Sequence, residues 1–151
     1  MKLLNKLSLI LFLFTLISCN KEDYESEEYT PIQVSPVKMD LTQVPYSKLS
    51  EYNFFNGAIK NQQPVYGVIP YKPESELFTD YAEKKRFVWV PTGLKATYVN
   101  DYSVLELPVG GALIKNFYYN NVQPSNTTKI IETRIMIRKS EGWIFADYVW
   151  N

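Results

Sequence analysis

Histidine is absent from all 151 residues of this chain. A Ser-His-Asp or Cys-His mechanism within the chain is therefore excluded. The chain also lacks the most common ligand of transition metals and the usual proton carrier near neutral pH. Any catalysis by this chain would have to use other groups, and its carboxylates are the main candidates.

Cysteine occurs only once, at Cys19. A single cysteine can form neither a disulfide within the chain nor a thiolate metal site. The chain also has no excess of positive charge, because it has 16 basic and 16 acidic side chains. Without residues 1–18 it loses Lys2 and Lys6, which leaves 14 basic and 16 acidic side chains. The charge pattern of a nucleic-acid-binding protein is missing, so we expect no nucleic-acid partner.

The start of the chain is typical of a signal peptide. Lys2 and Lys6 are followed by an apolar run of about 11 residues from Leu7 to Ile17, which is shorter than the roughly 20 residues that cross a membrane. The run ends in Leu-Ile-Ser-Cys, which resembles the lipobox of bacterial lipoproteins. We therefore expect a lipoprotein signal peptide over residues 1–18 and acylation at Cys19. Several acyl chains, palmitate among them, would hold the mature protein at a membrane.

Residues 19–44 are predicted to be a disordered or extended tether. Five of the seven residues from Glu22 to Glu28 are acidic, and apolar residues are few. The Lys-Glu-Asp at residues 21–23 resembles the surface-export signal of Bacteroidetes lipoproteins, although a generic solvated spacer would look the same. The resemblance implies the outer membrane, and it leaves open which face of that membrane the protein occupies.

The remaining residues, 45–151, are predicted to form one mainly β domain, a small antiparallel sandwich or partly open barrel with one or two short helices. The clearest strand covers residues 130–138, where Ile131, Thr133, Ile135 and Ile137 alternate with mostly polar residues. Residues 140–142 are predicted to form a hairpin turn that leads to a partner strand. Gly110-Gly111 indicates a bulge or a close approach of two backbone segments.

Other segments give weaker patterns. We expect short helices over residues 50–56 and 77–82, the second with Asp80 as its cap. We expect further strands over residues 65–69, 87–90, 96–100, 104–107 and 112–119. Glu132 and Arg134 are expected on the solvated face of the sheet, in cross-strand pairs.

Four ordered sequence pieces resemble a known family. They are Pro45-x-x-x-Leu49-x-x-Tyr52-x-x-Phe55; Pro70-Tyr71 with the run from Leu77 to Phe87; Pro108-Val109-Gly110 with the run from Leu113 to Tyr119; and Ile131 to Arg134 with Gly142-Trp143 and Tyr148-x-Trp150-Asn151. Together they resemble the N-terminal region of uncharacterised secreted bacterial proteins whose longer members are dihaem c-type cytochromes. This chain has no Cys-x-x-Cys-His haem-attachment motif, so we expect haem only in the longer relatives and no cofactor here. Its end directly after a predicted strand fits a truncated form of such a protein.

The family-like pieces contain four polar residues that are candidates for a shared cleft: Asp80, Arg86, Lys115 and Asn116. They would equally serve to hold loops and strand ends in place. No metal site is expected, since no Asp-x-Asp loop is present. The leading prediction is a non-catalytic, membrane-anchored module that binds or docks an envelope protein or an extracellular glycan.

Two alternatives stay open. The first is an enzyme that acts on an extracellular glycan through carboxylates. Glu74, Glu76, Asp80 and Glu83 lie close in sequence, and a glycosidase needs two carboxyl groups about 5–10 Å apart. The second is a non-functional remnant that needs missing C-terminal sequence to fold well.

Overall fold

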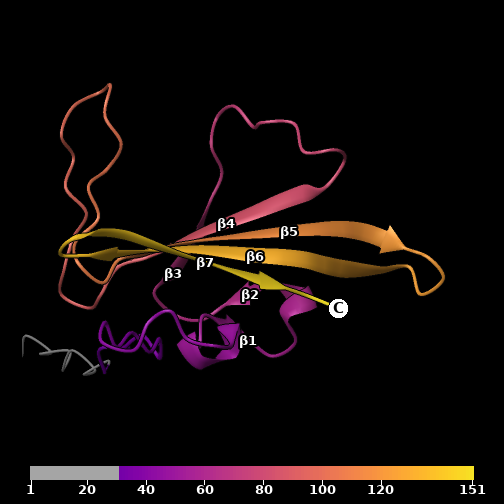
Figure 1. Cartoon of the computed structure of the whole chain (residues 1–151), viewed down its shortest axis with the longest axis horizontal. Helices are drawn as coiled ribbons and strands as arrows, with labels where there is room; N and C mark the ends of the chain where they lie inside the picture. Colours follow the sequence, from indigo (N-terminus) through magenta and orange to yellow (C-terminus); the bar gives the residue numbers. More distant parts are fainter. Residues whose placement is uncertain (1–30) are drawn as a thin grey trace, which may run out of the picture. The chain divides into compact units, whose positions relative to one another are not determined.

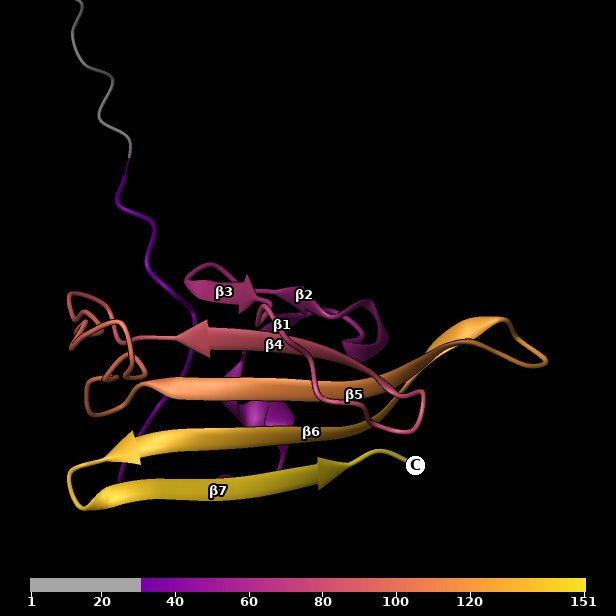
Figure 2. The same ribbon diagram turned by 90° about the horizontal axis from the view of Figure 1, so that it is seen from above.

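The computed structural model describes residues 31–151. The predicted signal peptide, Cys19 and residues 20–30 of the predicted tether lie outside this range. The described part is mainly β and antiparallel, with one five-stranded sheet in the order β3-β4-β5-β6-β7 and one two-stranded sheet, β1-β2 (Figures 1 and 2). The predicted fold class is confirmed, and the large sheet is open and is not closed into a barrel. Within residues 31–151 no helix is long and apolar enough to cross a membrane.

The long strands follow one another along the chain, and each pairs with its neighbour in sequence. The strands are β1 (Phe55–Asn56), β2 (Gln63–Pro64), β3 (Val68–Tyr71), β4 (Glu83–Trp89), β5 (Ala112–Val122), β6 (Thr127–Lys139) and β7 (Gly142–Val149). Two 3-10 helices, η1 (Leu49–Tyr52) and η2 (Ile59–Asn61), are the only helices among the described residues. The helix predicted over residues 50–56 is thus a single short turn that begins one residue earlier.

The core lies on one face of the large sheet, and η1, β1 and β2 cover that face (Figure 1). Tyr52 and Phe54 are buried in this covering layer, with stacked rings whose centroids are 5.0 Å apart. Phe87, Ile114 and Ile135 meet the layer from β4, β5 and β6, and each is at most 1% exposed. Burial of this many large apolar side chains is the main stabilising term for a domain of this size.

The alternation predicted for the strand at residues 130–138 is interrupted in the structure by a β-bulge. Phe117 pairs with Glu132 and Tyr118 pairs with Ile130, so Ile131 is the extra residue. An extra residue reverses the facing of every residue beyond it. Ile130 is therefore buried at 5% exposure in place of Ile131, while Ile135 keeps its predicted inward direction.

Part of the predicted tether packs on the domain. The indole of Trp89 donates to Ser35 Oγ at 3.0 Å, the amide of Lys38 donates to the Tyr52 carbonyl at 2.9 Å, and Val44 is buried in the core. Gly67 has a φ of +85°, and a Cβ there would lie 3.0 Å from the Ser35 Cβ. The packed domain therefore extends before residue 45, and Gly67 leaves room for the incoming segment.

Two segments that looked regular in the sequence are loops. The helix predicted over residues 77–82 is wrong, because Asp80 and Tyr81 both have left-handed backbones, with φ of 46° and 65°. The strands predicted over residues 96–100 and 104–107 are also absent, and only one bridge joins Thr97 to Glu106. No layer covers either segment, so their apolar side chains, such as Leu77 at 83% exposure, provide no burial to stabilise a regular element.

At Gly110-Gly111 the predicted close approach of backbones is present. The Gly110 amide donates to the Arg138 carbonyl at 2.7 Å, and the Arg138 amide donates to the Gly111 carbonyl at 2.8 Å. A Cβ at Gly111 would lie 2.9 Å from the Pro108 carbonyl oxygen. This glycine pair forms a tight turn that leads directly into β5.

Candidate binding site on the outer sheet face

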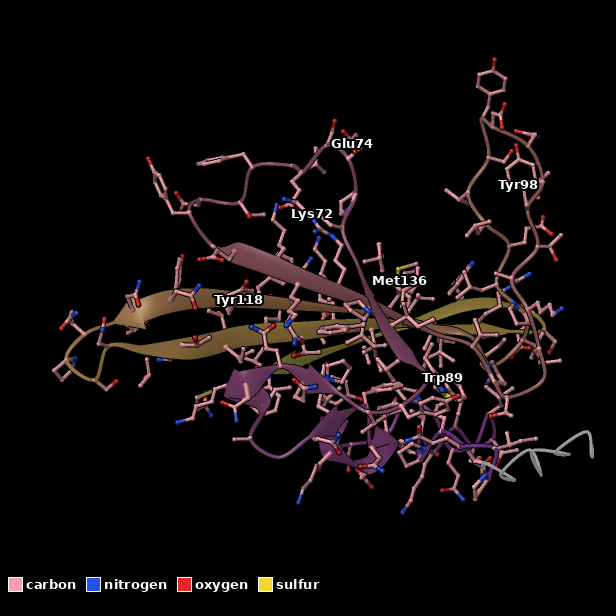
Figure 3. The ribbon with its side chains drawn as sticks, turned by 180° about the vertical axis from the view of Figure 1, so that it is seen from behind. Lys72, Glu74, Trp89, Tyr98, Tyr118 and Met136 are labelled. Atoms are coloured by element: carbon pink, nitrogen blue, oxygen red, sulfur yellow. The ribbon has the colours of Figure 1, made fainter. Side chains whose placement is uncertain are left out.

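The second face of the large sheet, opposite the covering layer, is called the outer face here. Two loops rise from this side of the sheet, the 72–82 loop between β3 and β4 and the 90–111 loop between β4 and β5 (Figure 1). Figure 3 shows Met136 of β6 between the loop that carries Lys72 and Glu74 and the loop that carries Tyr98. The outer face is thus the floor of an open space between two loops.

One row of side chains crosses all five strands on the outer face. The register places five residues side by side, in the order Tyr71, Arg86, Lys115, Arg134 and Asp147. Directly opposed residues on antiparallel strands have Cα atoms about 4.5–5.5 Å apart. Three cations therefore lie on adjacent strands, and like charges in this position destabilise a sheet. The stability of the sheet therefore does not explain this row of cations.

The three cations of the row differ in their partners. Arg86 is only 11% exposed and lies 3.6 Å from Glu76 of the 72–82 loop. Arg134 forms an ion pair with Glu132 and lies 4.0 Å from Asp147. Among the described residues, no carboxylate lies within ion-pair distance of Lys115. Lys115 is thus the cation of the row that has no anionic partner in residues 31–151.

The surroundings of Lys115 also disfavour its charge. Partial burial lowers the pKa of its ammonium group, and the nearby cations Arg86, Lys84 and Arg134 lower the pKa further, against a smaller opposing effect of Glu132. The face of the Phe117 ring, whose centroid lies 4.6 Å from the ammonium, attracts this cation without neutralising it, and the Arg134 guanidinium lies 5.0 Å from the same ring. An anion placed at Lys115 would supply the counter-charge that these neighbours do not provide.

A second row on the outer face is apolar. It runs parallel to the charged row and consists of Ile69, Val88, Leu113, Met136 and Phe145. Residues of both rows line a groove of about 490 Å³. Two aromatic side chains are open to solvent at its rim, with Tyr71 at 42% and Phe145 at 66% exposure. The groove therefore combines a cluster of cations with apolar and aromatic surface.

A second hollow, of about 580 Å³, lies beneath the 72–82 loop. It shares Tyr71 and Arg86 with the groove, so the two spaces adjoin. The loop is attached to β4 by the Glu76–Arg86 ion pair and by a hydrogen bond from the Lys84 ammonium to the Leu77 carbonyl. Tyr118 also lines the hollow, and burial together with a hydrogen bond to Glu83 raises the pKa of its hydroxyl.

The structure brings two of the four sequence-predicted site residues together. Arg86 and Lys115 are paired neighbours on the outer face. Asp80 lies on the exposed 72–82 loop, and neither hollow includes it; Glu76 contacts Arg86 instead.

Asn116 points into the core and is fully buried, so it does not line a cleft. Its amide donates to Gln62 Oε1 at 3.1 Å, and it accepts a hydrogen bond from Thr133 at 2.8 Å. Its position one residue after Lys115 sends it to the other face of the strand.

Sequence reasoning missed the role of Arg134 in this surface. Its outward direction was predictable from the alternation along residues 130–138, and it does lie on the solvated face near Asp147 of the neighbouring strand. Its place beside Lys115 depends on the register of β5 against β6, which has two irregularities. Tyr71, Met136 and Phe145 gave no signal in the sequence that could have linked them to one groove.

The acidic residues of the 72–83 segment have identified partners. Glu76 faces Arg86 and also lies 4.0 Å from Lys72, while Glu83 accepts a hydrogen bond from Asn120 at 2.8 Å. The carboxylate-dependent enzyme stays a prediction. Within residues 31–151 no group of three or more His, Cys, Asp or Glu side chains is placed to hold a metal ion. Comparison of the chain with models of known families, with curated proteins and with solved structures found no match.

Proposed function

We propose that this chain is a lipoprotein of the bacterial cell envelope whose β-rich domain binds an acidic glycan outside the cell, without catalysis, through the groove of the outer face. The observation that carries the proposal is Lys115, a partly buried cation with a cation on each side and no carboxylate within ion-pair distance among residues 31–151. A row of like charges is destabilising in a sheet. A bound anion would offset the repulsion between these cations, and this would explain why the row is present.

The groove favours a sugar with a negative group over a simple ion. A carboxylate or sulfate on a sugar ring would accept charge-assisted hydrogen bonds from Lys115 and Arg134. The carbon–hydrogen surface of the ring would pack on the apolar row, beside Phe145 and Tyr71. The groove of the outer face provides both the cations for the acidic group and the apolar surface for the ring.

The proposed anchor is the set of acyl chains on Cys19, after removal of the signal peptide over residues 1–18. The segment that leads back toward Cys19 contacts Trp89 and Tyr52 on the covered side of the sheet. This placement keeps residues 35–44 away from the groove. The outer membrane is the proposed location, on the basis of the Lys-Glu-Asp at residues 21–23.

We also propose that the domain is a counterpart of the N-terminal region of the longer dihaem proteins that it resembles. Residues 1–151 contain no Cys-x-x-Cys-His motif, so we propose no haem for these residues. The groove lies within the stretch that carries the resemblance, since Arg86, Lys115 and Arg134 are all part of the quoted pieces.

The test is calorimetric titration of the full-length protein in detergent micelles with three soluble polymers: polygalacturonate, dextran sulfate and neutral dextran. We expect binding to one or both acidic polymers, weakened by salt, and no binding to neutral dextran. Lys115→Met keeps the apolar stem and removes the charge, so we expect affinity to fall about tenfold, the equivalent of one charge-assisted hydrogen bond.

Lys60→Met is the matched control, because Lys60 lies exposed on η2 in the covering layer. Its affinity should equal that of the unaltered protein. Equal binding of dextran and acidic polymers, or an unchanged affinity of Lys115→Met, would contradict the proposal. Vesicles that contain phosphatidylglycerol serve as a further probe, and binding to these alone would contradict the choice of a glycan.

A further inference from the structure

Strand β7 is a free edge of the large sheet. It runs over eight residues, Gly142–Val149, and among the described residues no strand pairs with its other side. Figure 2 shows it at the margin of the sheet, leading to the end of the chain. The opposite edge, β3, has only four residues, and one of them is Pro70. Short length and proline are common protections of an edge strand, and β7 has neither.

The directions of the β7 backbone groups follow from its pairing with β6. The Trp150 amide donates to the Ile131 carbonyl at 2.9 Å, and alternate residues of an antiparallel strand bond to the same neighbour. Tyr148, Ala146 and Ile144 therefore direct their amides and carbonyls toward β6. The residues between them direct theirs away from the sheet; they are Trp143, Phe145, Asp147 and Val149.

The side chains of this edge are suited to pairing. Phe145 is 66% and Val149 is 74% exposed on the outer face. Asp147 is the only charged residue in the strand. The lysines and bulges by which proteins discourage contact between sheet edges are missing from β7. A second extended strand would gain backbone hydrogen bonds and bury exposed apolar surface here.

We propose that two copies of this chain pair through β7, antiparallel to each other, with the two-fold axis beside Ala146. In this register Trp143 lies opposite the partner's Val149, and Phe145 lies opposite the partner's Asp147. All four outward-directed residues of each strand then lie opposite outward-directed residues of the partner, so their backbone groups can form hydrogen bonds. This contact is isologous and closes after two copies.

Neighbouring registers are less favourable. A shift of one residue places outward-directed groups opposite inward-directed ones, so the hydrogen bonds are lost. A shift of two residues in one direction puts Asp147 opposite the partner's Asp147, which is a like-charge pair. The opposite shift leaves Val149 beyond the partner's strand. In the proposed register Asp147 also keeps its position 4.0 Å from Arg134 of its own chain.

The arrangement has a geometric consequence for the whole protein. A two-fold axis perpendicular to the sheet keeps both outer faces on one side and both 35–44 segments on the other. Two acyl anchors can then enter one membrane, and two grooves face the same direction. A polymer that reached both grooves would bind more tightly through multivalency, although the pairing itself does not depend on the proposed glycan.

The first test is oxidative cross-linking of full-length Ala146→Cys in detergent micelles. Residues opposite themselves at the axis form a non-hydrogen-bonded pair with Cα atoms about 4.5 Å apart, within the range that a disulfide requires. We expect a disulfide-linked dimer from Ala146→Cys. We expect none from Ile144→Cys, which lies opposite the partner's Tyr148, and none from the unaltered protein, whose Cys19 thiol is acylated in our account.

The second test is native mass spectrometry of the unaltered protein and of two variants at Val149. Val149→Pro removes an outward-directed amide without removing a bond to β6, so it should yield monomers. Val149→Thr keeps that amide and should leave the dimer intact. A monomeric unaltered protein, a dimer that persists in Val149→Pro, or failure of folded Ala146→Cys to cross-link would each overturn the proposal. A monomer that still bound acidic glycan would overturn the dimer alone, and a β7 dimer without glycan binding would overturn the proposed function alone.

Discussion

Lys115 on β5 lies directly opposite Arg134 on β6, with no carboxylate within ion-pair distance of the lysine among the described residues. On its other side Lys115 faces Arg86 of β4. A sheet gains stability when opposite charges pair across strands and loses it when like charges do. The arrangement therefore reduces the stability of the domain, and it is explained if a bound anion completes the site.

The lowered pKa of Lys115 predicts a specific dependence of stability on pH. Between that lowered pKa and 10.5, the ordinary value for lysine, the unfolded chain holds a proton that the folded chain has lost. Stability then rises with pH across this window. The free energy of unfolding of the unaltered protein should therefore increase relative to that of Lys115→Met as the pH is raised toward 10.5.

Denaturant unfolding of both proteins at a series of pH values measures this difference. Ionisation of tyrosines occurs in both proteins and cancels when one value is subtracted from the other. A difference that stayed constant, or that fell as the pH rose, would show that the surroundings of Lys115 do not disfavour its charge.

A buried hydrogen-bond network predicts that Asn116 matters for stability and not for binding. Asn116 joins Gln62 to Thr133, and Thr133 in turn accepts a hydrogen bond from the Trp150 indole at 3.1 Å. Asn116→Ala should lower the free energy of unfolding by about 3 kcal/mol, because it leaves buried partners unsatisfied. Urea unfolding measures the loss.

Asn56→Ala is the control for that substitution, since Asn56 is exposed on β1. Its effect should stay within about 0.5 kcal/mol. Acidic-glycan binding by folded Asn116→Ala should equal that of the unaltered protein. A loss of stability below about 0.5 kcal/mol in Asn116→Ala would contradict the role given to the network.

Lipid anchoring predicts a clear result for Cys19→Ala. Without the thiol no diacylglycerol can be attached, so the protein should leave the membrane fraction or keep its first 18 residues. Cell fractionation followed by intact-mass measurement distinguishes these outcomes from normal processing. Ser26→Ala, in the same acidic segment, should remain in the membrane fraction with the unaltered protein. Membrane association of Cys19→Ala together with normal removal of residues 1–18 would rule out the anchor.

The sequence predicted the β5 to β7 part of the sheet well, because each strand buries one face. Ile135 and Ile137 alternate with outward residues, and this alternation is a local signal. The 72–82 and 90–111 loops were mispredicted for a related reason. Phe78 and Val104 resemble core residues in sequence, yet they are 78% and 86% exposed, and no local signal says whether a second layer will cover a segment.

The candidate site was predictable only in part. Arg86 and Lys115 were recognised as polar residues in family-like pieces, and their proximity is a consequence of the β4–β5 register. The place of Arg134 beside Lys115 depends on the register of β5 against β6, and the burial of Asn116 depends on which face of β5 is covered. Facing and register are properties of the paired strands and not of either strand alone.

The most direct measurement is the pKa of the Lys115 side chain, followed by NMR in the full-length protein. The titration is carried out with and without polygalacturonate or dextran sulfate, and Lys115→Met identifies the Lys115 signal. An anion bound at Lys115 favours the charged ammonium, so its pKa should rise when an acidic polymer binds. Neutral dextran should leave the pKa unchanged. A Lys115 pKa that is the same with and without saturating amounts of both acidic polymers would contradict the account.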